Sequence, residues 1–293
     1  MQLSVVILNW NSTAATIRRV EQVSRWRRLT PTVWVVDNAS TDDSAEEISL
    51  RCPSARLLRS AVNLGFAGGN NLAIKAALET GSHLILLLNN DAEIDEAGVT
   101  SLLQLMESAP TLGMIGPNIN EFDGRRSAIY SGGQNIAFHL NTRIQVASPP
   151  TQIVSAVDYV PGTVVLIRRD VFLKAGLFDE RYFFSGEIAD LCARARRCGF
   201  ECGVATRIMA QHDTRLAGSR RSTLYAYYSL RNRLLYVRKF YSWLLLAWSF
   251  IYWGMAVRYL LAGRFTTVRV IWSAWSDGIR GKYGNRNAHF GFT

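Results

Sequence analysis

HLILLLNND, residues 83–91, is the segment from which the architecture of this chain can be inferred most directly. The apolar run Leu84–Leu88 is too short for a typical helix and lacks the alternation of a strand with one wet face, so it predicts a central strand buried on both sides. Asn89, Asn90 and Asp91 follow at once. Because open α/β sheets bind ligands at the carboxyl ends of their strands, these three residues mark a candidate site. A simple turn, with Asp91 capping the next helix, is the alternative.

The size and composition of the chain indicate a globular protein. Its 293 residues, 48% hydrophobic and 19% charged, suffice for one large domain or two modest ones. The four cysteines show no CxxC spacing, and they predict small core residues in a reducing compartment rather than a zinc site. The first ten residues lack the features of a secretory signal, which predicts a cytosolic chain.

Positive charge is concentrated in the last part of the chain. Residues 214–293 contain thirteen Lys or Arg and a single acid, whereas the preceding part contains 20 bases and 22 acids. The formal net charge of +10 therefore comes from the last eighty residues. No nucleic-acid recognition motif accompanies this charge, so nucleic acid is not expected as a partner.

Two further apolar runs, Leu3–Asn9 and Thr32–Asp37, flank residues 13–28, which have helical spacing. Together they predict a βαβ unit with parallel strands and a right-handed crossover. The turn after the first strand, residues 9–12, contains no glycine, whereas a dinucleotide-binding fold needs glycines there. The sequence therefore argues against a hydride-transfer enzyme.

Polar groups follow the other predicted strands as well. Asp37 ends the second strand, where a carboxylate can accept hydrogen bonds from a nucleobase or a ribose. Residues 63–71, NLGFAGGNN, predict a glycine-rich turn that opens a helix over residues 70–79. Backbone N–H groups at a helix start bind anions and glycines let a diphosphate approach, although a merely tight loop is the alternative. The combination favours a nucleotide site.

Four motifs carry a family resemblance: SVVILNWNS, VVDNASTDDS, NLGFAGGNN and LLLNNDAEI. In this order and spacing they resemble the N-terminal half of family 2 inverting glycosyltransferases, particularly the bacterial rhamnosyltransferase-like group that acts on cell-surface polysaccharides. The resemblance implies an α/β chain with a GT-A-type nucleotide-binding sheet, mixed but mostly parallel and flanked by helices. It implies that Asp37 holds the base of a nucleotide sugar. The residues expected to contact the nucleotide are Asn9, Asn11, Asp37, Asn63, Gly65, Gly68, Asn70 and Asn90.

The same resemblance makes Asp91 the last acid of a DXD-type motif, which binds a divalent cation, Mn²⁺ or Mg²⁺, that bridges the diphosphate. Asn89 stands where the first acid of that motif is expected, so the loop supplies one carboxylate and the ion needs other ligands. His212 follows a strand predicted over residues 201–209, and family members carry His at this place. We therefore expect His212 to contact the metal or the diphosphate, with a polar surface group as the alternative.

A second acidic segment is SGEIADLCARARRCG, residues 185–199, whose spacing predicts a helix ended by a glycine. Glu187 and Asp190 share one face of its first turn, where they either complement the helix dipole or provide a general base. Relatives commonly have Glu-Asp-x-Asp-Leu-Cys here, with the second residue as the base. Because Ile188 cannot accept a proton, the role passes to Glu187, which is preferred, or to Asp190.

The segment between these two sites predicts a strand over residues 112–119 and, within residues 160–170, a turn that feeds a second strand. Asp170 is expected to cap a short helix after that second strand. Residues 120–150 are polar and contain glycine, which predicts an irregular excursion on the acceptor side.

The last part of the chain is rich in Tyr, Trp, Leu and Arg. Residues 240–257 carry no charge, and a run of this length reaches the lower bound for spanning a bilayer. The recurring aromatic and basic residues favour helices that lie in the membrane interface. A spanning helix, a buried helical hairpin and a homo-oligomer interface are the alternatives.

These inferences divide the chain into a GT-A-type catalytic domain, residues 1–213, and a helical region, residues 214–293. The expected reaction is the metal-dependent, inverting transfer of a sugar from a dTDP- or UDP-linked donor, with rhamnose suggested by the resemblance, to a lipid-linked saccharide. The expected location is the cytoplasm, on the inner face of the plasma membrane. A non-catalytic sugar-nucleotide binder or scaffold, motivated by Ile188, and a nucleotidyltransferase are the alternatives.

Overall fold

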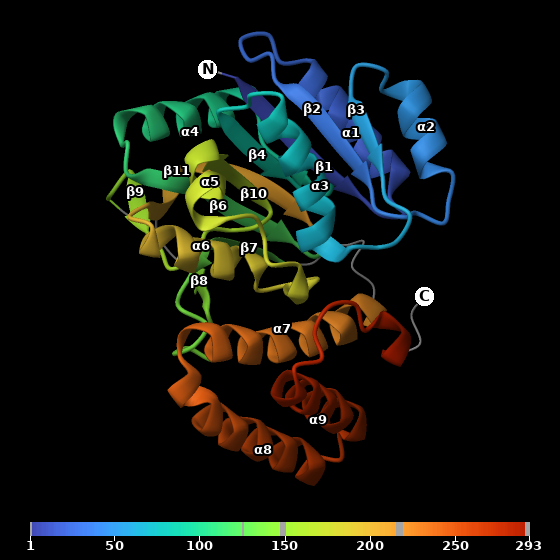
Figure 1. Ribbon diagram of the computed structural model, residues 1–293, viewed down its shortest axis with the longest axis vertical. Coiled ribbons are helices and arrows are strands. Elements are labelled where there is room, and N and C mark those ends of the chain that lie inside the picture. Colours follow the sequence, from blue (N-terminus) through green and yellow to red (C-terminus); the bar gives the residue numbers. More distant parts are fainter. Residues whose placement is uncertain (1, 125, 147–150, 215–218, 291–293) are drawn as a thin grey trace.

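A computed structural model of the chain describes residues 2–124, 126–146, 151–214 and 219–290. The described residues form a mixed sheet whose main strand order is β3-β2-β1-β4-β10-β6-β11-β5 (Figure 1). The strands are β1 (Leu3–Asn9), β2 (Thr32–Asp37), β3 (Arg56–Arg59), β4 (Leu84–Leu88), β5 (Ala92–Glu93), β6 (Leu112–Phe122), β7 (Ser127–Gly133), β8 (Arg143–Gln145), β9 (Val154–Ala156), β10 (Val164–Arg168) and β11 (Glu201–Asp213). The helices are α1 (Thr13–Ser24), α2 (Ser44–Arg51), α3 (Gly65–Glu79), α4 (Glu96–Ser108), α5 (Arg169–Ala175), α6 (Glu187–Arg197), α7 (Ser219–Phe240), α8 (Leu245–Leu261) and α9 (Phe265–Arg280).

The predicted fold class is confirmed. Strands β1 to β4 run parallel, β10 runs antiparallel between β4 and β6, and β11 runs parallel to β6. Every residue of β4 is buried because apolar side chains of α1, α2 and α4 cover one face of the sheet and those of α3, α5 and α6 cover the other. The carboxyl ends of β1, β2 and β4 therefore meet at one edge, which positions the site.

Helix α3 begins at Gly65, so the prediction of a glycine-rich turn followed by a helix from residue 70 is wrong in its boundary. The glycines lie inside the first turns of the helix because they permit close packing. A Cβ atom added at Gly69 would lie 2.5 Å from Leu8 Cδ1, and one at Gly65 would lie 2.2 Å from the carbonyl oxygen of Phe183. Gly65 also has a φ of +71°, which favours glycine.

Five other features differ from the prediction. The helix expected over residues 13–28 ends at Ser24, and β6 and β11 extend to Phe122 and Asp213. Residues 120–150, expected to be irregular, contribute β7 and β8, which pair as an antiparallel extension of β6. Asp170 lies in the first turn of α5, whose N-cap is Arg168. The strand differences arise where pairing with a distant strand overrides local composition.

The C-terminal helices form a separate layer, in which α7 lies between the sheet and the pair α8 and α9 (Figure 1). Leu234 and Val237 of α7 pack in one apolar cluster with Ala189 and Ala193 of α6. The division of the chain at residue 213 remains a proposal.

Two buried side chains of α7 bind the segment that leads into α6. Asn232 donates from Nδ2 to the carbonyl oxygens of Tyr182, Phe184 and Ser185, at 2.8, 2.8 and 2.6 Å. Arg231 donates from Nη2 to the carbonyl of Tyr182 at 3.0 Å. Helix α7 therefore fixes the backbone immediately before the acidic segment.

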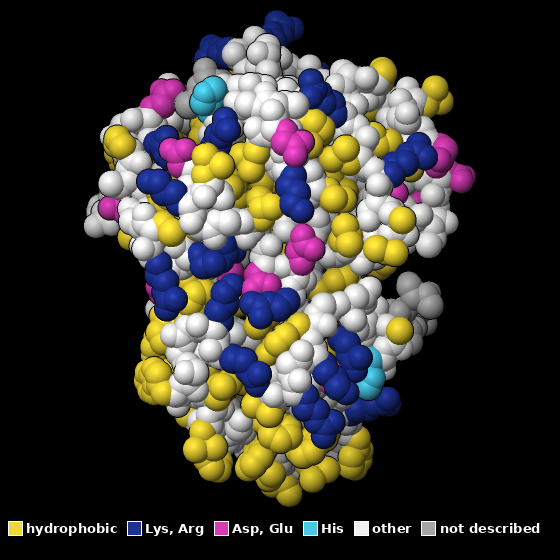
Figure 2. Space-filling view, in the orientation of Figure 1, with side chains coloured by type: hydrophobic (Ala, Val, Ile, Leu, Met, Phe, Trp, Pro, Cys, Tyr) yellow, Lys and Arg dark blue, Asp and Glu magenta, His cyan; other side chains and the backbone are white. Residues whose placement is uncertain are grey.

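Helices α8 and α9 expose many large apolar side chains. Figure 2 shows hydrophobic side chains gathered at the lower end of the molecule, with Lys and Arg side chains above them. The chain from Ser242 to Leu261 is long and apolar enough to cross a membrane by length and composition, and little of it is buried. The alternative of a helical hairpin buried inside the chain is therefore wrong for α8, because most of this helix is exposed. The most exposed members of this apolar face are Trp243, Leu246, Phe250, Leu261, Phe265 and Trp272.

Candidate functional site

A continuous hydrogen-bond chain links the carboxyl ends of three parallel strands. Asp37 Oδ1 accepts from Asn9 Nδ2 at 2.9 Å and from the Ser40 hydroxyl at 2.5 Å. Thr16 donates to Asn9 Oδ1 at 2.7 Å and accepts from Asn90 Nδ2 at 3.0 Å. Three residues predicted to bind the nucleotide, Asp37, Asn9 and Asn90, are thus brought together. Thr16, on α1, was missed because nothing in a helix sequence marks a residue that bridges two strand ends.

The loops after β1 and β2 are joined by Asn11. Its Oδ1 accepts from the Thr41 backbone N–H at 2.7 Å, and its own backbone N–H donates to the Ser40 hydroxyl at 2.9 Å. Asn11 and Ala39 have φ angles of +50° and +60°. Backbone held in this region costs of order 1–3 kcal/mol per residue and clusters at ligand sites.

The start of α3 is occupied by protein groups. The carbonyl oxygen of Phe183 accepts from the backbone N–H of Phe66 at 2.6 Å and of Ala67 at 3.4 Å. The interpretation of NLGFAGGNN supposed that N–H groups at this helix start bind a diphosphate, but these two are already bonded to the protein.

The remaining residues of this motif hold α3 in place. Asn63 Oδ1 accepts from the Gly65 N–H at 2.8 Å, and Asn70 Nδ2 donates to the carbonyl of Phe66 at 2.8 Å. A Cβ at Gly68 would lie 2.8 Å from Leu64 Cβ. A nucleotide contact at Asn63, Gly65, Gly68 or Asn70 stays a prediction, and the structure gives each residue a packing role beside it.

Asp91 and His212 lie side by side. Strand β11 reaches past residue 209 and pairs with β5, which brings His212 Nε2 to 3.4 Å from Asp91 Oδ1. His212 Nδ1 lies 3.3 Å from Glu121 Oε1, and Glu121 pairs with Arg143 at 2.7 Å. Burial alone would lower the pKa of His212, but its contacts with Asp91 and Glu121 raise it to about 9. The imidazole is therefore held between two carboxylates.

These residues fit a divalent cation whose other ligands come from a diphosphate. Asp91 Oδ1 is buried and has no hydrogen-bond partner among the described residues. Its separation from His212 Nε2 suits two atoms that each lie about 2.1 Å from one ion, and binding of the ion would displace the proton from Nε2. No group of three or more His, Cys, Asp or Glu side chains in the described residues is placed to hold a metal by itself. Mg²⁺ is commonly held by one or two protein carboxylates together with phosphates and waters.

Glu187 begins helix α6 at the wall of a cavity. It follows three residues of left-handed or unusual backbone, since Phe183, Ser185 and Gly186 have φ angles of +60°, +72° and +95°. The carboxyl group is buried, and its Oε2 finds no hydrogen-bond partner among the described residues. Burial raises the pKa of Glu187 to about 7, with a smaller contribution from the charge of Asp190. A carboxylate near neutral pKa suits a general base.

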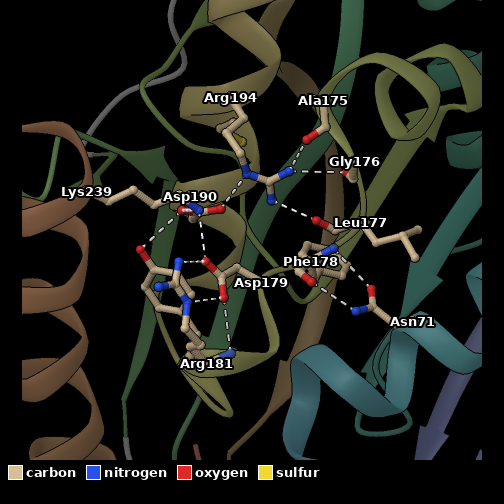
Figure 3. Close-up of polar contacts among 12 residues, drawn as sticks. Asn71, Ala175, Gly176, Leu177, Phe178, Asp179, Arg181, Asp190, Arg194 and Lys239 are labelled. Carbon is tan, nitrogen blue, oxygen red and sulfur yellow. Dashed lines mark hydrogen bonds and ion pairs between the residues drawn. The ribbon is translucent and has the colours of Figure 1, made fainter. Parts of the chain in front are cut away.

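Asp190 has a different environment (Figure 3). Its carboxylate is fully buried and pairs with Arg194 Nε at 2.6 Å and with Lys239 Nζ at 2.6 Å. Tyr182 donates its hydroxyl to Asp190 at 3.3 Å, and Arg194 also donates to the carbonyl of Leu177 at 2.8 Å. Asp190 therefore joins α6 to α7 and to the preceding loop, whereas Glu187 has the free carboxylate oxygen.

Removing Lys239 tests this role. The Lys239→Met chain is expected to lose about 1–3 kcal/mol of unfolding free energy, because Asp190 keeps Arg194 and Asp179 keeps Arg181, but both carboxylates lose Lys239. The measurement is urea unfolding at neutral pH. Arg238→Met, at an exposed neighbouring position on the same helix, is the control and should change stability by less than about 0.5 kcal/mol. Equal effects of the two substitutions would show that Asp190 does not need Lys239.

A cavity of about 790 Å³ connects the acidic helix start to the C-terminal helices. Glu187, His212 and Asn89 line its sheet end, so the preferred base lies in the same hollow as a predicted metal ligand. Arg143 and Arg233 also line it, and neither was singled out from the sequence, because one comes from the segment expected to be irregular and the other was one of many tail arginines.

Comparison with known proteins identifies the sequence family. The model of glycosyl transferase family 2 matches residues 4–173. A low-salt glycan biosynthesis hexosyltransferase, Agl10, from Haloferax volcanii is 25% identical over 82% of this chain and 76% of its own. An N-acetylglucosaminyl-diphospho-decaprenol L-rhamnosyltransferase from Mycobacterium tuberculosis is 26% identical over 57% of this chain, and the match spans 62% of that relative, less than two thirds of its length.

A solved structure shares the fold. GalNAc-T7, crystallised with UDP, GalNAc and Mn²⁺, superposes with a TM-score of 0.63 at 17% identity. The match covers 81% of this chain and 48% of GalNAc-T7. At this identity the likeness concerns the arrangement of sheet and helices.

Proposed function

Given that the chain belongs to glycosyl transferase family 2, we propose that it transfers a sugar from a nucleotide donor to a lipid-linked saccharide with inversion at the anomeric carbon. The observation that carries the proposal is the shared cavity of Glu187 and His212, with Asp91 beside the histidine. This arrangement puts a base of near-neutral pKa and a candidate diphosphate site around one volume.

The chain's residues divide the work as follows. Glu187 removes the proton of an acceptor hydroxyl while that oxygen bonds to the anomeric carbon of the sugar. The bond from this carbon to the donor phosphate breaks on the opposite face, so the configuration inverts and a nucleoside diphosphate leaves. Asp37, Asn9 and Asn11 are proposed to hold the nucleoside. Asp91 and His212 are proposed to hold Mn²⁺ or Mg²⁺, which supplies positive charge for the leaving diphosphate.

The donor and the acceptor are proposed from the relatives. The names of two relatives specify a hexosyltransferase and a rhamnosyltransferase that acts on a diphospho-decaprenol compound. We propose a dTDP- or UDP-linked sugar, with rhamnose first, and an acceptor carried on a lipid diphosphate.

The exposed apolar face of α8 and α9 supports attachment to the inner face of the plasma membrane. Aromatic and basic residues together favour the interface of a bilayer, and each basic residue near an anionic surface adds about 1 kcal/mol. Arg258, Arg264 and Arg269 lie on or between these helices.

Donor screening with Mn²⁺ tests the assignment. A correct nucleotide sugar at one hundred times its Kd should add about 2.7 kcal/mol to stability and raise the melting temperature by several degrees. Incubation with a lipid-linked acceptor should then release nucleoside diphosphate and form a product of inverted configuration. Release of pyrophosphate would favour the nucleotidyltransferase alternative. Binding without turnover of any donor would favour a scaffold, the alternative motivated by Ile188.

A further inference from the structure

The cavity beside Glu187 has a second end that the proposed chemistry does not use. It runs from the sheet edge to α7, α8 and α9, where apolar side chains line it. Met255 and Tyr259 of α8 and Ile271 of α9 belong to this lining, and these two helices also carry the exposed apolar face. The hollow therefore continues from the reacting centre toward the part of the protein proposed to contact lipid.

Arg233, on α7, is a positively charged residue that lines this second end of the cavity. Its guanidinium lies 4.5 Å from the centre of the Trp248 ring and donates to the carbonyl oxygens of His139 and Leu140 at 2.8 and 3.0 Å. Burial lowers the pKa of Arg233, and among the charged or ionisable groups that the structure describes as acting on it none is a carboxylate. Among the described residues no carboxylate lies within 4.0 Å of Arg233.

Arg143, which also lines the cavity, and the two cations bound to Asp190 are neutralised, whereas Arg231 has no carboxylate partner in the described part of the chain but does not line the cavity. Arg143, on the same cavity wall, pairs with Glu121 at 2.7 Å, and Arg194 and Lys239 both pair with Asp190 at 2.6 Å. Arg233 thus differs from them in having positive charge without a counter-charge while lining a cavity. A partly buried cation without a counter-charge favours an anionic ligand, and a guanidinium matches the geometry of phosphate oxygens.

We propose that Arg233 binds the phosphate of the lipid-linked acceptor, with the apolar walls from α8 and α9 receiving the first units of its hydrocarbon chain. Tyr159 and Tyr225 also line the cavity, and their hydroxyl groups can donate to a phosphate bound there. The saccharide then extends from Arg233 toward Glu187 along the cavity. This inference rests on the proposed transfer to a lipid-linked acceptor and specifies which part of the acceptor the chain recognises.

The test uses the full chain and geranyl diphosphate as a probe, with geraniol as the uncharged comparison. EDTA is present, so that metal-dependent binding of a diphosphate at Asp91 does not contribute. Calorimetry should detect the diphosphate and not the alcohol. Arg233→Gln should weaken binding by about tenfold to hundredfold, the range expected for a charged hydrogen-bonding group. Arg233→Lys should lose less, because it keeps the charge but not the planar fork.

Arg238→Gln is the matched control. Arg238 also lies on α7 and donates to a backbone carbonyl, that of Ile279 at 2.7 Å, but it does not line the cavity. Its replacement should leave the Kd within about twofold of the wild-type value. Equal affinity of wild type for geraniol and for geranyl diphosphate, or unchanged affinity after Arg233→Gln, would overturn the proposal. If Arg233→Gln fails to fold, the wild-type comparison and Arg233→Lys decide.

Two further arms separate the sources of phosphate. Excess phosphatidylglycerol vesicles should not displace geranyl diphosphate. Displacement would mean that Arg233 binds the headgroups of ordinary phospholipids instead. Stabilisation by the nucleotide donor with Mn²⁺ should survive Arg233→Gln. If the wild-type chain binds no nucleotide donor, the result would count against the proposed function. If it binds the donor but not geranyl diphosphate, the result would count against this inference alone.

Discussion

The Glu187→Gln enzyme is expected to transfer sugar about 10²- to 10⁴-fold more slowly than the unaltered chain, the range by which a positioned general base accelerates a reaction. Donor affinity should change little, because Glu187 lies at the cavity wall and not among the residues at the ends of β1 and β2. Initial rates with saturating donor and acceptor measure the effect. Glu201→Gln, an exposed carboxylate at the start of β11, is the control.

The pH dependence of the wild type follows from the same group. Because burial raises the pKa of Glu187 to about 7, the base is protonated and inactive below that pH. We expect kcat to fall about tenfold per pH unit below pH 7 and to level off above it. A rate that stays flat down to pH 5 would assign the proton transfer to a group of ordinary carboxylate pKa.

Stability should move in the opposite direction to activity. The folded chain binds the proton of Glu187 more tightly than the unfolded chain, whose pKa is near 4.5. Stability is therefore highest below pH 4.5 with respect to this group and falls as the pH rises through about 7. The cost at pH 8 is on the order of 3 kcal/mol, and Glu187→Gln should remove it. A variant that is both inactive and less stable at pH 8 would indicate a structural role instead.

The Asp91→Ala chain is expected to bind nucleoside diphosphate in Mn²⁺ no better than wild type does in EDTA. Loss of a metal ligand should weaken metal-dependent binding by about a hundredfold or more, since even outer partners of metal ligands are worth about 10- to 100-fold. The fold should survive the loss of the ion pair with His212, because His212 keeps Glu121. Asp91 Oδ1 has no hydrogen-bond partner to lose among the described residues, and the backbone carbonyl of residue 91 still accepts from the Asp213 N–H.

Two comparisons sharpen this result. Glu121→Gln removes the carboxylate on the far side of His212 and should weaken metal-dependent binding by a smaller factor, about tenfold. Asp43→Ala, at an exposed position whose side chain caps no backbone group, should have no effect. Unchanged metal-dependent affinity after Asp91→Ala would remove Asp91 from the diphosphate site.

The parts of the fold that sequence reasoning predicted are those in which a local pattern has one physical solution. The run Leu84–Leu88 is apolar on both faces, so only a strand covered on both sides buries it. Because β1, β2 and β4 are parallel, the polar residues that follow them must meet at one edge of the sheet. Cys52, Cys192 and Cys202 are buried, as their small apolar character suggested, whereas Cys198 is exposed, so the prediction of a core position is wrong for it.

The parts that sequence reasoning missed depend on partners far along the chain. Helix α3 starts at Gly65 because Phe183, more than one hundred residues later, caps it. Glu121 meets His212 because β6 and β11 extend together beyond their apolar segments. The difference between Glu187 and Asp190 also arises in this way, since Lys239 from α7 neutralises one carboxylate and nothing described bonds to Oε2 of the other.

Helix α7 determines where this chain can be recombined with its relatives. Asn232 donates hydrogen bonds to the carbonyls of the turn before α6, and Lys239 forms an ion pair with Asp190 of that helix. A chimaera spliced near residue 213 would exchange the support of the catalytic turn together with the tail. A crossover after Phe240 would keep both contacts, but it would also replace Asp277 and Gly284, which bind Tyr227 and Arg231 of α7, so the new tail would have to supply the same partners.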